Sequence, residues 1–364
     1  MPTIFVKDEM RAAVEAASGG KQTVLYTASG QPSVMNVIPS FNLEDIDASL
    51  GVGVHPAFVV GGAQKGELFI GAYQGIVKNG ELISLPGVDP SVSRNHDGFV
   101  TAARANGAGW HVMSNVEYAA IALWCWKNGF MPRGNTGYGR SSDATHETAR
   151  RTDGAAAGLT TGSPRTLTGS GPASWRHDNT PGGISDICGN IWEWSPGMRV
   201  VQGEIQVIAN NDAALNATDL GATSAAWKAI DGATGLLINP TFTGTIAGGD
   251  YVPTTPKSVR YAVSGAENYT LVRASGQSFE GVTNPGATPA SDAALSVLKG
   301  YGIYPPANVG LGGDGLYMNA QGERIAVRGG VWSHGVNAGI FTISIGLQRS
   351  QVNADLGSRP AFLI

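Results

Sequence analysis

Cysteine is almost absent from this chain of 364 residues, which contains only Cys125 and Cys188. Two thiols are too few for a disulfide framework and too few for a self-contained zinc site. Neither cysteine has a basic neighbour in the sequence that would lower the pKa of its thiol. We therefore predict that both are core thiols and that apolar burial, not cross-linking, holds the fold together.

Charge is also sparse, because charged residues make up 14% of the chain and the formal net charge is -4. This balance gives no electrostatic basis for binding nucleic acid or an anionic membrane. No run of about eighteen apolar residues is present, and the start of the chain lacks the basic segment and apolar core of a secretory signal. We therefore expect a soluble protein with no signal peptide and no membrane insertion.

Glycine, in contrast, is abundant, with 52 residues beside a hydrophobic fraction of 42%. This composition predicts a globular, loop-rich protein. Residues 1–48 are predicted to be a small N-terminal appendage with a short helix at 8–17. The main domain is predicted from residue 49 onward, where alternating segments separated by glycine-rich turns predict strands at 57–60, 67–70 and 75–78.

Two helices are predicted in the first half of this domain. Asp97 can cap one that runs to about Asn106, and Ser114 opens a stronger one, since Ser114 and Glu117 have the spacing of a capping box. Gly129 suits the end of the second helix. The following residues, 134–183, are rich in Gly, Ser, Thr and Pro, which predicts long loops.

Trp192 and Trp194 lie one residue apart, so a strand would direct both indoles to the same side. Buried indoles are the commoner outcome for such a pair, and an aromatic platform for a sugar is the alternative.

The C-terminal segment combines an apolar pattern with side chains that share no chemistry. Phe341, Ile343 and Ile345 alternate with Thr342, Ser344 and Gly346, which is the period of a strand with one buried and one open face. Because the open positions share no chemical character, they favour a display surface over a catalytic site.

Three sequence blocks occur in one order, namely Gly109–Ala120, Asp186–Trp194, and Arg328–Trp332 followed by Gly357–Arg359. Together they resemble the formylglycine-generating-enzyme branch of the C-type lectin fold. That family has a helix near a Glu-aromatic-Ala-Ala signature, a Gly-Asn-Val-Trp-Glu-Trp strand, an Arg-Gly-Gly-x-Trp turn and a closing Gly-Phe-Arg. The similarity covers residues 50–200 and 320–364.

The resemblance implies a fold class and an organisation. We expect an α+β, C-type lectin-like domain over residues 49–364, with long loops and an insertion at about 203–316. The enzymes of the family use two reactive cysteines near the C-terminal motif, whereas this chain has no cysteine after Cys188. The Glu-Pro-Asn, Gln-Pro-Asp and Trp-Asn-Asp triplets of calcium-dependent lectins are absent as well. We therefore predict a non-enzymatic binding protein, with a formylglycine-generating-type oxidoreductase or a fixed lectin-like protein as alternatives.

Within this branch, residues 328–362 resemble the variable region of proteins diversified by a retroelement, such as phage tropism determinants. In that group, adenine-directed reverse transcription rewrites the Asn codons AAC and AAT, which limits the residues that can appear. The positions that carry such residues are Val331, Ser333, His334, Ser344, Gly346, Leu347, Ala354, Asp355 and Ser358. Gln348 and Gln351 are added as variable positions that require another adenine-containing codon.

A rigid frame would hold these variable side chains. Its predicted members are Arg328, Gly329, Gly330, Trp332, Phe341, Ile343, Ile345 and Arg359, with Trp192 and Trp194 from the middle block. Exposed substitutions typically change stability by about 0.5 kcal/mol or less, whereas emptying a buried aromatic position costs about 3–5 kcal/mol. Separating frame from display would therefore allow many binding surfaces on one fold.

The sequence thus predicts a diversified ligand-binding protein, such as a phage or prophage adhesion component associated with a virion. Its partner would be a protein or glycan on a target cell surface. Because the variable set lacks Trp, Tyr and Arg, we expect a shallow, weakly binding site, with His334 as contact surface and not a catalyst. No cofactor is expected, although the acidic loops at 210–212 and 312–315 leave calcium as an alternative.

Overall fold

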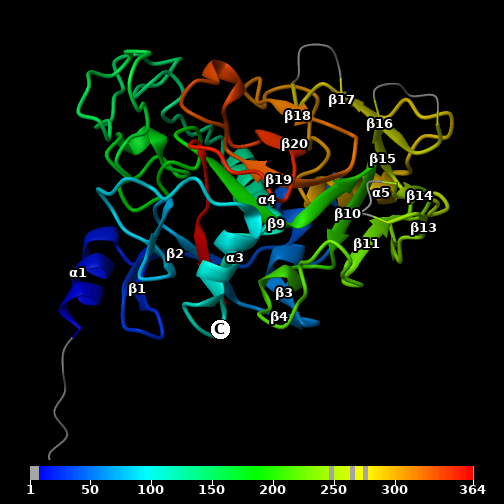
Figure 1. The fold of residues 1–364 in the computed structure, drawn as a ribbon, viewed down its shortest axis with the longest axis horizontal. Coiled ribbons are helices and arrows are strands. Elements are labelled where there is room, and N and C mark those ends of the chain that lie inside the picture. The colour runs from blue at the N-terminus through cyan, green and yellow to red at the C-terminus, as the bar shows by residue number, and fades with distance from the viewer. Residues whose placement is uncertain (1–7, 246–249, 263–266, 274–277, 364) are drawn as a thin grey trace, which may run out of the picture.

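The computed structural model describes residues 8–245, 250–262, 267–273 and 278–363. The fold is α+β, with two main sheets and a central helix that packs against the larger sheet (Figure 1). The α-helices of the described residues are α1 (Glu9–Ser18), α2 (Leu43–Ile46), α3 (His96–Arg104), α4 (Asn115–Lys127) and α5 (Asp292–Gly300). Short 3₁₀ turns occur at Ala48–Leu50, Pro56–Phe58, Ala173–Trp175, Asp212–Ala214 and Gly335–Asn337.

The first sheet joins both ends of the described chain. Its order is β1 (Gln22–Tyr26), β2 (Pro32–Pro39), β5 (Glu67–Gly71), β22 (Pro360–Phe362) and β8 (Trp110–Val112). Since β2 pairs with β5 along five residues, from Met35 opposite Gly71 to Pro39 opposite Glu67, the N-terminal segment belongs to this sheet. The predicted division into an appendage at 1–48 and a separate domain is therefore wrong, although the predicted helix at 8–17 matches α1.

The second sheet is larger and is centred on β9. Its main path runs β17 (Val282–Thr283), β16 (Thr270–Arg273), β15 (Arg260–Ala262), β10 (Glu204–Ile208), β9 (Trp192–Val201), β19 (Glu323–Arg328), β20 (Ile343–Leu347) and β18 (Leu316–Met318). Off this path lie β11 (Trp227–Ile230), β12 (Leu237–Ile238) and β21 (Leu356–Gly357). Strands from the segment predicted as an insertion, 203–316, extend the sheet on the β10 side, while β18 ends it on the other.

Helix α4 occupies the centre of the molecule. Ser114 caps it as predicted, because the Ser114 hydroxyl accepts from the Glu117 N–H (3.3 Å) and the Glu117 carboxylate accepts from the Ser114 N–H (2.8 Å). Residues 115–123 are all buried, so this helix has no solvent-facing polar side. Gly129 follows the C-cap with φ +73°.

Helix α3 begins differently from the prediction. Asn95, and not Asp97, is the N-cap, since its Oδ1 accepts from the Gly98 N–H (2.8 Å). The Asp97 carboxylate instead accepts from Arg349. The helix therefore begins earlier than predicted and leaves the Asp97 carboxylate available for a long-range ion pair.

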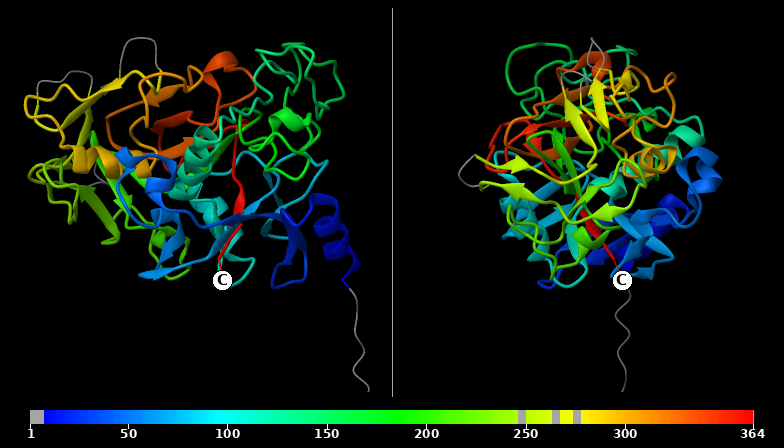
Figure 2. Two further views of the ribbon diagram at one scale, coloured as in Figure 1. Left: turned by 180° about the vertical axis from the view of Figure 1, so that it is seen from behind. Right: turned by 90° about the vertical axis from the view of Figure 1, so that its right-hand side faces the viewer.

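The remaining described strands form three small hairpins. They are β3 (Val59–Val60) with β4 (Ala63–Gln64), β6 (Gly75–Lys78) with β7 (Glu81–Ser84), and β13 (Phe242–Thr243) with β14 (Val252–Pro253). The predicted strand at 57–60 is a 3₁₀ turn in its first half and the short strand β3 in its second, while those at 67–70 and 75–78 are confirmed. Residues 134–191 are loops with isolated bridges and one 3₁₀ turn, and they lie beside the C-terminal loops in both views of Figure 2.

Candidate functional site

The closing arginine of the C-terminal motif, Arg359, is fully buried and connects the two main sheets. Its Nε and Nη2 donate to the two carboxylate oxygens of Glu193 in β9 (2.9 and 2.8 Å). Its Nη1 donates to the carbonyl oxygen of Gly71, at the end of β5 (2.8 Å), and Nη2 also donates to the carbonyl oxygen of Ser185. Arg359 is therefore a structural frame residue, as predicted.

The second frame arginine, Arg328, is also buried but has no carboxylate partner among the described residues. Its Nε and Nη2 donate to Oδ1 of Asn115 (3.0 and 2.7 Å), and Nη2 donates to the carbonyl oxygen of Gly302 (2.7 Å). The guanidinium lies 5.7 Å from the ring centre of Tyr118. Burial lowers the pKa of Arg328 to about 10. The neutral acceptors and the aromatic face stabilise the cation against this effect.

The turn after Arg328 requires both of its glycines. Gly329 and Gly330 have φ values of +87° and +83°, a region that residues with a side chain avoid. A Cβ on Gly330 would also lie 2.6 Å from the Cβ of Ala338, and one on Gly329 would lie 2.8 Å from the carbonyl oxygen of Ile187. Any substitution here would shift the backbone that leads into the predicted variable positions.

Most of the predicted variable positions reach the surface, but three do not. Ser333, Gln348 and Ala354 are exposed, and the half-buried positions are His334, Gly346, Leu347, Gln351 and Asp355. Val331, Ser344 and Ser358 are buried, with exposed fractions of 2%, 5% and 0%. The prediction that these three display their side chains to a ligand is therefore wrong.

The three buried positions share a cause that sequence periodicity does not reveal. Ser344 lies in β20, which has β19 on one side and β18 on the other, and residues 341–345 are buried without alternation. The carbonyl oxygen of Ser358 accepts from the Gly75 N–H (2.8 Å) directly before the buried Arg359. Val331 packs in a cluster that contains Trp192 and Trp194. These three side chains are buried because other parts of the chain cover them.

The positions that reach solvent gather around a group of rings. We define the display surface as residues 332–336, 346–348 and 351–355 together with Tyr317, and the buried Trp192 lies next to it. The His334 ring stacks on Tyr317 (centroids 5.0 Å apart, 28° between planes) and meets Trp192 edge-on (5.2 Å, 73°). Trp192 and Tyr317 also meet edge-on at 5.8 Å. The predicted variable set itself contains no Trp, Tyr or Arg, but the half-buried Tyr317 ring lies against it from outside that set.

Sequence reasoning missed several members of the display surface, among them Tyr317, Val336 and Val352. Tyr317 enters from β18 because β18 and β20 pair in parallel with Tyr317 opposite Ser344, and no local pattern indicates this. Val336 and Val352 are 57% and 51% exposed. Valine satisfies the codon criterion at these two positions as it does at Val331, so this signal was available in the sequence.

His334 lacks the surroundings of a general base. Its Nδ1 is buried and finds no hydrogen-bond partner in the described part of the chain. Burial lowers the pKa of His334, and the charge of Asp355 opposes that shift only in part. The ring is therefore neutral at pH 7 and contributes an aromatic face and one nitrogen acceptor or donor to the display surface.

The loops at 134–191 support the display surface from the side. The Tyr138 N–H donates to the carbonyl oxygen of Trp332 (2.8 Å), and the Gly335 N–H donates to that of Thr136 (3.0 Å). Arg165 donates to the carbonyl oxygen of Ala354 (3.3 Å). These contacts use the backbone of the display surface, so they hold its shape whatever side chains it carries.

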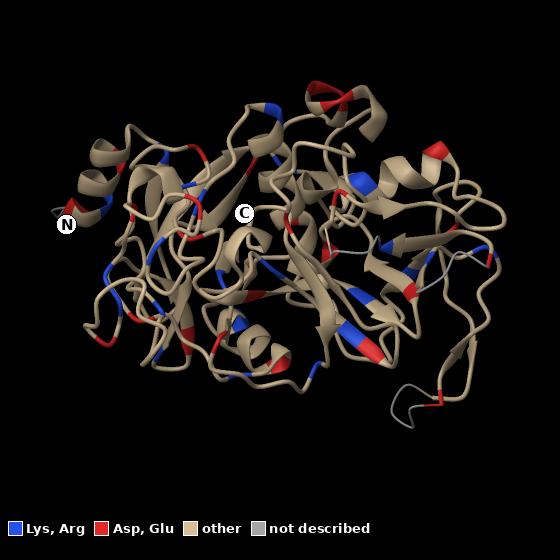
Figure 3. Cartoon of the chain, turned by 90° about the horizontal axis from the view of Figure 1, so that it is seen from above, with Lys and Arg blue, Asp and Glu red and all other residues tan. Residues whose placement is uncertain are grey.

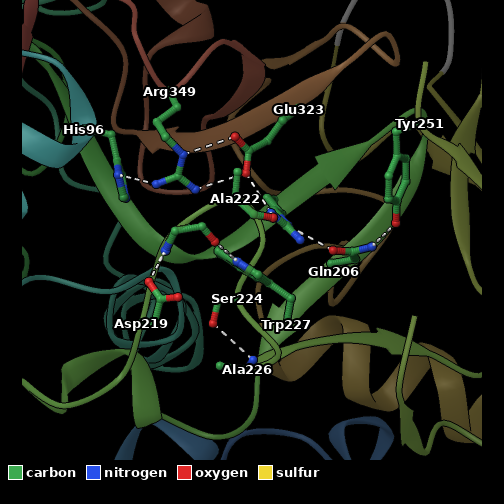
Figure 4. A network of polar contacts seen from close by, with 12 residues as sticks. His96, Gln206, Asp219, Ala222, Ser224, Ala226, Trp227, Tyr251, Glu323 and Arg349 are labelled. Carbon is green, nitrogen blue, oxygen red and sulfur yellow. Dashed lines mark hydrogen bonds and ion pairs between the residues drawn. The ribbon is translucent and has the colours of Figure 1, made fainter. Parts of the chain in front are cut away.

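Arg349, which lies between two segments of the display surface, belongs to a polar network that also includes Glu323 and Gln206 (Figure 4). Arg349 donates to both carboxylate oxygens of Glu323 (3.1 and 3.0 Å) and to Asp97 (2.8 Å). Glu323 also accepts from Arg199 (2.7 Å), whose guanidinium lies 4.3 Å from the ring centre of Trp227. One arginine between positions 348 and 351 is thus tied to β19, β9 and α3.

No protein-family model and no curated protein matches this chain. Its function must therefore be argued from the geometry of the site. Charges of both signs are interspersed over the described residues in the view from above (Figure 3). Within the described residues, no helix is long and apolar enough to cross a membrane.

The two cysteines are free, buried core thiols. Burial raises the pKa of Cys188 well above its usual value and also raises that of Cys125. The Cys125 thiol donates to the carbonyl oxygen of His177 (3.1 Å). Neither environment stabilises a thiolate, so the geometry gives no support to nucleophilic thiol chemistry.

The two acidic loops that could take calcium use their side chains within the protein. Asn211 donates to Glu117 and to the carbonyl oxygen of Ala57, while Asp212 accepts from the Gly61 N–H (2.7 Å). Asp314 is buried and accepts from the Phe341 N–H (2.6 Å). Among the described residues, no group of three or more His, Cys, Asp or Glu side chains has the arrangement of a metal site.

Proposed function

We propose that this protein is a non-enzymatic ligand-binding protein of the C-type lectin-like fold, whose display surface is diversified by a retroelement. The ligand is a protein or glycan on a target cell, and the setting is phage or prophage adhesion. The observation that carries this proposal is the separation between a buried, internally satisfied frame and a display surface whose side chains support little of the fold.

The frame supports the proposal because the three sequence blocks meet in space. Asn115 from the first block binds Arg328 from the third, and Glu193 from the second binds Arg359. The Gly189 N–H of the second block donates to the carbonyl oxygen of Gly329 (2.8 Å). Residues that resemble a family signature are thus the residues that hold the site together.

The display surface supports the proposal because some of its side chains make no hydrogen bonds within the described protein. The side chains of Ser333 and Gln348 make no hydrogen bond to a described residue, while the backbone of the same segment is well held. The half-buried rings of Tyr317 and His334, packed against the buried Trp192, are of the kind that anchors protein and glycan ligands. Substitution around a fixed ring cluster would change specificity without rebuilding the fold.

Deep sequencing of the 3′ end of the gene, with its downstream DNA, tests the diversification. We expect amino-acid variation at codons of exposed or half-buried positions such as 333, 334, 336, 352, 354 and 355, beside a near-copy with adenines at those codons. We expect codons 331, 344 and 358 to be invariant, because their side chains are buried. An invariant 3′ end without a near-copy contradicts diversification and leaves a fixed binding protein.

A binding experiment tests the surface itself. Replacing His334 and Ser333 together should abolish adhesion to a cell type that the wild-type protein labels, while the thermal unfolding temperature stays unchanged. The control is a double substitution at the exposed Val52 and Val309, which lie outside the display surface. Equal loss of adhesion in both variants would contradict the assignment of this surface.

A further inference from the structure

A second candidate site lies apart from the display surface. A cavity of about 470 Å³ is bordered by the α1–β1 turn, β2 and the residues after it, α4, and His177 with Asp178 from the long loops. None of its lining residues belongs to the variable region at 328–362. Its volume is within the range of small-molecule pockets.

The apolar part of this cavity is rigid and aromatic. Ile38 and Ile121 are buried and line it, beside the half-buried rings of Trp124 and Phe41. The Trp124 ring stacks on Phe130 (5.7 Å, 18°), and the Phe41 ring meets Phe58 edge-on (5.2 Å, 73°). Because neighbouring rings already fix Trp124 and Phe41, a flat ligand would bind without a large entropic cost of ordering these side chains.

The polar part of the cavity offers hydrogen-bond donors. The His177 Nδ1 accepts from the Ile184 N–H (2.8 Å), so the proton of the neutral ring is on Nε2, which has no partner among the described residues. Burial lowers the pKa of His177 to about 4, which keeps the ring neutral at pH 7. The Lys21 ammonium donates to Asp178 (2.7 Å) and Thr180 (3.1 Å), leaving its third proton for a ligand.

The acceptors beside these donors are already occupied. Asp178 accepts from the Thr180 N–H and hydroxyl as well as from Lys21. The Asn36 Oδ1 accepts from Gln22 (3.3 Å), and its amide donates to the carbonyl oxygen of Gly182 (2.7 Å). A ligand must therefore bring acceptor oxygens and not donors.

We propose that this cavity binds a small aromatic carboxylate, with its ring against Trp124 and Phe41 and its carboxylate at Lys21 and the Nε2–H of His177. This site is independent of the proposed diversification, because it uses other residues. Its occupant would be a diffusible small molecule and not a cell-surface receptor.

Three indoles of similar size test the proposal on the full chain by saturation-transfer NMR. The carboxylate indole-3-acetate should bind, the neutral indole-3-acetamide should bind more weakly, and the cation tryptamine should bind at least about tenfold more weakly than the acetate. Absence of indole-3-acetate binding at millimolar concentration would overturn the proposal. Tryptamine binding as tight as that of the acetate would overturn it too.

Two variants place the binding in this cavity. Lys21→Met should weaken indole-3-acetate by about tenfold or more while changing the acetamide little, and Lys299→Met, which removes another exposed ammonium, is the matched control. Ser40→Phe should block the cavity mouth, since Ser40 lines it and is exposed. If both variants melt like the wild type and still bind the acetate as tightly as it does, the cavity assignment is wrong.

Discussion

The frame and the display surface alternate along one C-terminal segment, yet they differ in almost every physical respect. Val331 is buried while Ser333 is exposed, and Asp355 reaches solvent four residues before the fully buried Arg359. Frame side chains bond to strands far away in the sequence, whereas display side chains make few contacts. Tolerance to substitution therefore follows contacts in space, and four predictions test this difference.

The largest expected effect concerns Asp314, a buried acid bonded to the backbone of the frame residue Phe341. Burial raises the pKa of Asp314 to about 8, and its carboxylate accepts from the Phe341 N–H. Because the pKa is raised in the folded state, the contribution of Asp314 to stability is fully present below about pH 4 and is lost as the pH rises through about 8. A tenfold change in a protonation equilibrium corresponds to about 1.4 kcal/mol, so the total loss amounts to several kcal/mol.

Asp314→Asn should remove this loss. The variant should unfold at about the same urea concentration as the wild type at pH 4 and at a higher concentration at pH 9. Parallel urea titrations at several pH values measure the difference. A constant difference between the two proteins across this pH range would show that Asp314 does not titrate as described.

The next effect breaks the frame at its ion pair. Arg359→Met leaves the Glu193 carboxylate buried with one fewer partner and should lower the free energy of unfolding by about 3–5 kcal/mol. Denaturant titration measures it, and Arg94→Met at an exposed arginine is the control. A loss below about 1 kcal/mol would mean that Arg359 is not part of the frame.

A smaller effect is expected where frame and display surface meet. Arg349→Ala removes the bonds to Glu323 and Asp97, which are only partly buried, and should cost about 1–2 kcal/mol. It should also speed hydrogen exchange at residues 346–353 more than in β9. Equal acceleration in both places would show that Arg349 acts on the whole fold and not on the display surface.

The smallest effects belong to the display surface. Ser333→Asn and Ala354→Asn should each change the free energy of unfolding by about 0.5 kcal/mol or less, because both positions are exposed. Val331→Asn should cost more than about 2 kcal/mol, since it places an amide in an apolar cluster. Thermal melts of the three variants measure the difference between exposed and buried positions. Similar losses of stability in all three would contradict the distinction between frame and display surface.

Local signals in the sequence predicted several features well. The Ser114 capping box and the loops after residue 134 follow from short-range chemistry, whereas the frame arginines were predicted from the family resemblance. The prediction of a separate N-terminal appendage was wrong because β2 pairs with β5, which follows an intervening hairpin in the chain. The prediction that the Ser344 side chain is displayed was wrong, because the period of a strand shows which side chains share a face and not whether that face is covered.

The sequence by itself determined an α+β fold with little charge, buried thiols and a C-terminal segment of mixed chemistry, because composition, capping and glycine act locally. Only the tertiary structure decided which variable-region residues face solvent, that Tyr317 joins His334 and Trp192, and that a cavity forms beside Trp124. Each of these depends on contacts between strands or loops that are far apart in the chain. No local pattern in the sequence specifies which side chains such contacts bury.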